Sequence, residues 1–192
     1  MKIGFYLGSF DPIHIGHINV IRCVLNSKVV DKIIVVPALK NPWKYIEPAP
    51  FDDRLKMIQM SIQPFGDKCE VSDIEKSNNT HYSYETCQLL KEQYKNDILF
   101  IIGGSDVAST ISKWKNYDEV ISPNFGLIAV NRVNGDSPKH IFWEGRSHVS
   151  IVDNALDVSS TYVRQLLKTN TPVYPLIPLN VENYIKSNNL YG

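Results

Sequence analysis

The feature that most constrains the fold is a regular alternation of short apolar runs with longer amphipathic stretches. We expect the apolar runs to form buried strands over 3–7, 31–37, 69–74, 97–103, 126–130 and 149–152. Apolar residues at helical spacing predict helices over 15–25, 51–62, 84–94, 160–168 and 179–188, with short helices after 106 and over 117–121. Such strands, apolar on both faces and alternating with helices, indicate a parallel sheet covered on both sides. The expected class is α/β, a Rossmann-like doubly wound sheet.

The length of 192 residues fits one domain, 1–192, whose part from about 153 to 192 is mainly helical. In open parallel sheets, ligands bind beyond the carboxyl ends of the strands, so function is expected just after each strand. The proline-rich stretch 37–50 is the longest expected loop, and a loop of that length is often a functional lid.

The composition excludes several classes of protein. Twenty basic and twenty acidic residues cancel, which argues against nucleic acid as a main partner. The three cysteines, Cys23, Cys69 and Cys87, are widely spaced, and this predicts neither a disulfide framework nor a zinc site. No apolar run approaches the roughly 20 residues of a membrane helix, and no signal peptide is evident. We therefore expect a cytoplasmic protein with no membrane partner, and a homo-oligomer stays open.

Residues 8–17, Gly-Ser-Phe-Asp-Pro-Ile-His-Ile-Gly-His, follow the first strand, where a phosphate site is expected. Gly8 and Ser9 can turn tightly with their N–H groups facing a ligand, and Gly16 lets a ligand approach the backbone. His14 and His17 are three residues apart and share a face in a first helical turn. Two imidazoles and the positive end of a helix would form a cradle for phosphate oxygens.

Two other interpretations of this segment stay open. It could be a capped helix with two surface histidines, in which Asp11 is the N-cap and Pro12 the first helical residue. The histidine pair could also bind a metal, but no third ligand is evident nearby, so no metal site is predicted.

Segment 8–17 resembles the signature of the HxGH nucleotidyltransferases, and other segments are similar to the bacterial nicotinate mononucleotide adenylyltransferase family. These are 101–106 (Ile-Ile-Gly-Gly-Ser-Asp), 113–114 (Lys-Trp), 158–164 (Val-Ser-Ser-Thr-Tyr-Val-Arg), 176–178 (Leu-Ile-Pro) and 189–191 (Asn-Leu-Tyr). The resemblance implies a transfer of AMP from ATP, accompanied by Mg²⁺, to a pyridine mononucleotide, with release of pyrophosphate. A phosphate nucleophile needs no general base, so positioning and charge stabilisation suffice.

By this resemblance, His14, His17, Arg164 and Lys44 are the catalytic residues around the phosphates. The implied ATP-binding residues are Gly8, Ser9, Phe10, Gly16, Gly103, Asp106, Ser159, Ser160 and Thr161. Gly103 and Asp106 would meet the adenosine ribose. An alternative for 159–161 is an ordinary helix cap with Arg164 in solvent.

The resemblance assigns Tyr82, Ser83 and Trp114 to the mononucleotide. Trp114 could stack on the pyridine ring or be an ordinary core residue, and Ser83 could simply be a helix N-cap. The sequence departs from the family pattern at Trp43, where a histidine is usual, and at the extra residue in 103–105.

The runner-up functions are adenylyl transfer to nicotinamide mononucleotide or to phosphopantetheine. Outside enzymes, the chain could be a nucleotide-sensing module that has lost turnover.

Overall fold

The computed structural model describes residues 1–40, 47–104, 107, 111, 114, 116, 125–132, 148–153 and 158–192. Its centre is a six-stranded sheet in the order β3-β2-β1-β4-β5-β6, with every neighbouring pair parallel. The strands are β1 (Lys2–Gly8), β2 (Lys32–Pro37), β3 (Cys69–Val71), β4 (Ile98–Gly104), β5 (Phe125–Arg132) and β6 (His148–Asp153). All six predicted strands are confirmed in place and type.

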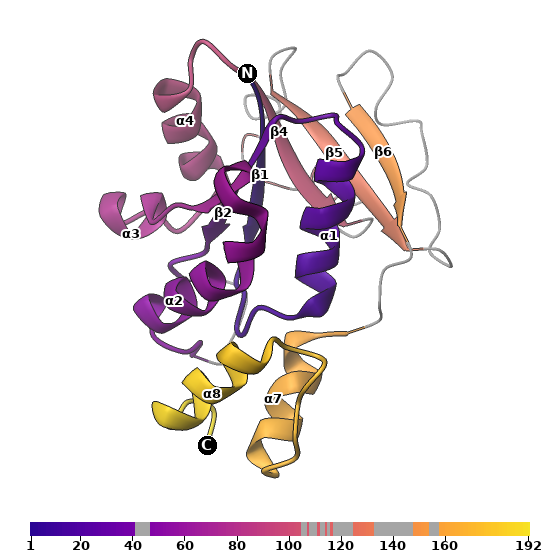
Figure 1. The fold of residues 1–192 in the computed structure, drawn as a ribbon. Coiled ribbons are helices and arrows are strands. Elements are labelled where there is room, and N and C mark those ends of the chain that lie inside the picture. Colours follow the sequence, from indigo (N-terminus) through magenta and orange to yellow (C-terminus); the bar gives the residue numbers. More distant parts are fainter. Residues whose placement is uncertain are drawn as a thin grey trace.

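The helices in the described residues are α1 (Ile15–Asn26), α2 (Phe51–Ile62), α3 (Ile74–Asn78), α4 (Ser83–Gln93), α7 (Ser160–Lys168) and α8 (Leu179–Ser187), with a 3₁₀ segment η1 (Gln63–Lys68). The ribbon shows α1 and α2 beside the sheet, with α7 and α8 beyond the end of the sheet that leads into α1 (Figure 1). The two C-terminal helices therefore lie at the end of the sheet where a ligand is expected.

Successive apolar residues of β2, β4 and β5 enter different core clusters, which explains why these strands do not alternate apolar with polar residues. In β2, Ile33 and Val35 belong to the cluster that includes buried side chains of α1, α2 and α8, whereas Ile34 and Val36 pack with those of α3 and α4. A strand buried on both faces cannot alternate apolar with polar residues. The doubly wound parallel sheet predicted from sequence is confirmed.

Two details of the prediction are wrong. The strand expected over 69–74 ends at Val71, because the chain turns at Ser72 and enters α3, where the Ile74 N–H donates to Ser72 Oγ at 3.3 Å. Ser83 is not the N-cap of α4 but its first residue, and Tyr82 is the cap. The short helix expected over 117–121 lies outside the described residues, as does most of the one expected after 106. No helix in the described part of the chain is long and apolar enough to cross a membrane.

The cysteines provide a test of this packing. Burial raises the pKa of the Cys69 thiol and of the Cys87 thiol to about 12, whereas Cys23 is half-buried on α1. At pH 8 a thiol with that pKa is thiolate in roughly one molecule in 10,000, and the thiolate is the reactive form. We expect a disulfide reagent to label one thiol quickly in the native protein and three after unfolding. Cys23→Ser should abolish the fast phase, and fast labelling that survives this change would contradict the burial.

Candidate active site

The site is built where the strand order reverses. β1 and β4 are neighbours at the centre of the sheet. In the strand order, β2 lies next to β1 on one side of this pair and β5 lies next to β4 on the other side, so the chain moves outward in opposite directions from the two strands. Such a topological switch point opens a crevice beyond the carboxyl ends of the two strands. Gly8 and Gly104 are the last residues of these strands, so the segment 8–17 lies at the expected place.

Phe10 shapes the turn that follows β1. Its backbone lies in the left-handed region (φ 47°), and the residue is 2% exposed. Its ring packs edge-on against His17, with ring centroids 4.9 Å apart. A Cβ on Gly8 would lie 3.0 Å from the Phe10 ring, so glycine permits this close approach. The Phe10 side chain is therefore a core group, which leaves its backbone for any contact with a ligand.

His14 and His17 lie together as predicted. His14 is the N-cap of α1 and His17 its third residue, and the two rings stack with centroids 3.7 Å apart and planes 25° apart. The His14 backbone N–H donates to His17 Nδ1 at 3.2 Å. Because Nδ1 is the acceptor, a neutral His17 ring carries its proton on Nε2 and presents an N–H donor there. The prediction that Asp11 caps this helix is wrong, since the cap of α1 is His14, three residues further on.

Asp11 instead joins distant parts of the chain. Its carboxylate is buried, with the residue 7% exposed, and its Oδ1 accepts from the Ala49 N–H at 3.0 Å and from the Tyr191 hydroxyl at 2.8 Å. Its Oδ2 lies 3.6 Å from Nη1 of Arg164. These partners come from the residues that precede α2, from the residues after α8 and from α7, and all of them are distant from Asp11 in sequence.

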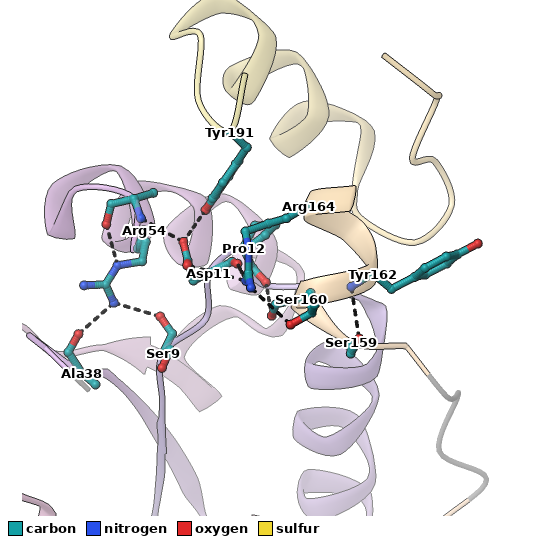
Figure 2. Close-up of polar contacts among 12 residues, drawn as sticks. Ser9, Asp11, Pro12, Ala38, Arg54, Ser159, Ser160, Tyr162, Arg164 and Tyr191 are labelled. Atoms are coloured by element: carbon teal, nitrogen blue, oxygen red, sulfur yellow. Dashed lines mark hydrogen bonds and ion pairs between the residues drawn. The ribbon is translucent and has the colours of Figure 1, made fainter. Parts of the chain in front are cut away.

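The N-terminus of α7 is brought against the same turn (Figure 2). Ser159 caps the helix, since its Oγ accepts from the Tyr162 N–H at 3.2 Å, while Ser160 Oγ donates to the Pro12 carbonyl at 3.0 Å. The predicted helix start at 159–161 is confirmed. The positive end of α7 and the first turn of α1 therefore share one region.

Arg164 extends from α7 to the β1–α1 turn. Nη1 donates to the Asp11 carbonyl at 2.7 Å, and Nη2 donates to Thr161 Oγ1 at 3.2 Å. The side chain is only 17% exposed, so the alternative that Arg164 is solvated is wrong. Its cation is held beside the cradle predicted for phosphates.

Arg54 is a residue of this region that the sequence reasoning missed. It is 1% exposed, and its guanidinium donates to the carbonyls of Ser9 (2.8 Å), Ala38 (2.8 Å), Leu39 (3.3 Å) and Ala49 (2.9 Å). Burial lowers the pKa of Arg54, and the charges of Asp11 and other nearby groups oppose that shift. Arg54 thus connects the turns after β1 and β2 to the residues that precede α2 (Figure 2).

The available signal for Arg54 was its position. Arg54 occupies the same face of α2 as the buried residues Met57, Ile58 and Ser61, at helical spacings of three, four and seven. A charged residue in such an apolar stripe needs buried partners, and these cannot be identified from the spacing.

Glu75 supports the same segment from α3. It is 5% exposed and accepts from the Leu39 N–H at 2.8 Å and from Thr86 Oγ1 at 2.9 Å. Burial raises the pKa of Glu75, while these hydrogen bonds and Arg54 oppose the shift. At Leu39, just before residues 41–46, the backbone N–H is therefore bound by Glu75 and the carbonyl by Arg54, both of which are buried.

The remaining predicted site residues are more dispersed. Tyr82 is 45% exposed at the start of α4, with Ser83 next to it, and Trp114 is half-buried and packs against the cluster that contains Cys87 and Leu90 of α4. Gly103 faces Val107, since a Cβ there would lie 2.6 Å from Val107 Cβ. Lys44 and Asp106 lie outside the described residues, as does Trp43. Within the described residues, no three or more His, Cys, Asp or Glu side chains cluster to hold a metal ion.

A doubly wound parallel sheet with a histidine pair and a helix N-terminus at its switch point is the arrangement expected of a nucleotidyltransferase. Residues 5–166 match the model of the cytidylyltransferase-like family. A protein of Flavobacterium johnsoniae named probable nicotinate-nucleotide adenylyltransferase is 33% identical over 195 residues, covering 100% of this chain and 99% of that protein. A protein of the same name from Methylacidiphilum infernorum is 35% identical, with 99% and 92% covered. The chain belongs to the cytidylyltransferase-like, HxGH nucleotidyltransferase family.

Solved structures agree on the fold. The Plasmodium falciparum nicotinic acid mononucleotide adenylyltransferase complexed with NaAD superposes with a TM-score of 0.83 at 23% identity, over 99% of this chain and 97% of that one. At that identity the likeness concerns the fold, and it extends over nearly the whole of both chains.

Proposed function

We propose that this protein transfers AMP from ATP to nicotinate mononucleotide, forming deamido-NAD and pyrophosphate. The observation that carries the proposal is the meeting of the stacked His14–His17 pair with the N-terminus of α7 and Arg164 around the turn after β1. Full-length relatives carry the name of this activity, which supports this choice of acceptor.

The mechanism we propose is an in-line attack of the mononucleotide phosphate on the α-phosphorus of ATP. His17 Nε2–H and the His14 ring stabilise the charge that develops around that phosphorus, and the N–H groups of Gly8 and Ser9 belong to the same shell. Ser159, Ser160 and Thr161 present the positive end of α7 to the outer phosphates, and Arg164 adds a cation. No group has to remove a proton, because the attacking phosphate is already an anion.

A Mg²⁺ ion bound with ATP would supply neutralisation of part of the triphosphate charge, and no residue of this chain is assigned to hold it. Gly103 and Asp106 take the ribose, and Phe10 and Gly16 contribute backbone to the phosphate turn. Tyr82, Ser83 and Trp114 take the mononucleotide, and Lys44 approaches the phosphates from the segment 37–50. We further propose one catalytic domain that acts in the cytoplasm, with or without association into a homo-oligomer.

The test is pyrophosphate release from ATP and Mg²⁺ with three acceptors in parallel: nicotinate mononucleotide, nicotinamide mononucleotide and 4′-phosphopantetheine. We expect strong turnover with nicotinate mononucleotide and weaker turnover with the amide. A reversed ratio would assign the protein to the amide route, and turnover with phosphopantetheine alone would refute the pyridine assignment. Silence with all three, together with tight ATP binding, would favour the nucleotide-sensing alternative.

A further inference from the structure

One polar contact near the site involves a residue that no part of the mechanism uses. The hydroxyl of Tyr191, three residues beyond the cap of α8, donates to Asp11 Oδ1 at 2.8 Å across 180 positions of the sequence (Figure 2). Burial and the Asp11 carboxylate raise the pKa of Tyr191 far above its usual value. The hydroxyl therefore stays a neutral donor at any working pH.

The backbone supports the view that this placement is specific. Tyr191 and Asn189 both adopt a left-handed conformation, with φ of 66° and 49°. This region is unfavourable for a residue with a Cβ, and a tyrosine there is uncommon. The conformation directs the ring back toward the β1–α1 turn, where the hydroxyl meets its acceptor.

Within the described part of the chain, three donors lie against the buried carboxylate of Asp11, and the charge of the buried Arg54 acts on it from further away. Besides Tyr191 the donors are the Ala49 N–H at 3.0 Å and Arg164, whose Nη1 lies 3.6 Å from Oδ2 while donating to the Asp11 carbonyl at 2.7 Å. If the tyrosine hydroxyl is removed, more of the charge must be balanced by a cation. Arg54 is held by four carbonyls, so Arg164 is the cation that can move. The guanidinium would then move closer to the carboxylate and be less available to a phosphate.

We propose that Tyr191 is a positioning residue of the nucleotide site, which sets the place of Arg164 by satisfying the carboxylate of Asp11. The inference rests on the proposed function in so far as Arg164 binds the phosphates of ATP. It predicts that the tyrosine hydroxyl controls nucleotide affinity without touching the nucleotide.

The experiment compares Tyr191→Phe with Tyr184→Phe. The Tyr184 hydroxyl on α8 donates to Asp53 Oδ1 on α2 at 2.7 Å, so both variants lose one hydroxyl–carboxylate bond at the same end of the chain. Tyr191→Phe should raise KM for ATP about tenfold, the effect of one hydrogen bond to a charged group, and leave KM for the mononucleotide unchanged. Tyr184→Phe should leave both KM values near those of the wild type. The two variants should lower the thermal midpoint by similar amounts. Equal kinetics in the two variants would overturn the proposal.

A double-mutant cycle tests the route through Asp11. In an Asp11→Asn background no carboxylate charge remains to attract Arg164, so Tyr191→Phe should change ATP affinity less than twofold there. A full effect in that background would refute the route. Binding of the non-cleavable analogue α,β-methylene-ATP is measured by calorimetry in the same variants. That measurement decides the role of Tyr191 even if the wild type turns over none of the three acceptors. A failure of the proposed adenylyl transfer can therefore be distinguished from a failure of the proposed role of Tyr191.

Discussion

Replacing His17 with alanine is expected to lower kcat by about two orders of magnitude or more while the fold stays intact. The neutral ring presents its Nε2 proton because Nδ1 accepts the His14 N–H at 3.2 Å. A fixed donor aimed at charge that develops only in the transition state raises kcat, and alanine has no donor. The measurement is steady-state pyrophosphate release, with circular dichroism and thermal melting to establish folding.

The control for His17 separates catalysis from helix capping. His17 occupies the third position of α1, where glutamine and glutamate commonly accept the N–H of the cap residue. His17→Gln can therefore keep that hydrogen bond while losing the imidazole. We expect it to melt close to the wild type and still to lose most of its turnover. A near-normal rate in either variant would exclude His17 from the catalytic role.

Replacing Arg54 with alanine is expected to lower the free energy of unfolding by about 3–5 kcal/mol. The change would leave four carbonyls without their donor and the buried Glu75 without a nearby cation. Such a loss is a large part of the roughly 5–15 kcal/mol that stabilises a domain. Urea unfolding at constant pH measures it.

Two further variants of α2 make the Arg54 result specific. Lys56 is exposed on the same helix, so Lys56→Ala should change the stability by less than about 0.5 kcal/mol. Arg54→Lys keeps the charge but offers a compact ammonium in place of a planar fork that reaches four carbonyls, and it should recover less than half of the loss. Full stability in Arg54→Lys would show that charge alone, and not the set of hydrogen bonds, holds these turns.

Much of the fold could be predicted because its causes are local. Strands buried on both faces must be apolar throughout, and β2 and β4 were identified for that reason. The three-residue spacing of His14 and His17 was enough to predict that they share a face of the first turn of α1. The start of α7 was predicted from the capping residues at 159–161.

The local errors arose where two signals competed. The pair Asp11-Pro12 is typical of a helix start, yet α1 begins at Ile15 and Asp11 is bound by partners from three other segments. Ser83 has the side chain of an N-cap, but the helix begins one residue earlier than expected. In both cases a residue suited to capping lies within a few residues of the true cap, and the spacing of apolar residues does not fix a helix boundary more finely than that.

The sequence by itself determined the parallel α/β class, the place of the histidine pair after the first strand and the start of the α7 helix. Only the tertiary structure decided that Arg54 joins the turns after β1 and β2, and that Tyr191 and Arg164 meet at Asp11. The physical reason is the range of the interactions. Periodicity and capping act within a few residues of the chain, whereas a buried charge is satisfied by whatever donors or acceptors the packing of the helices on the sheet brings to it.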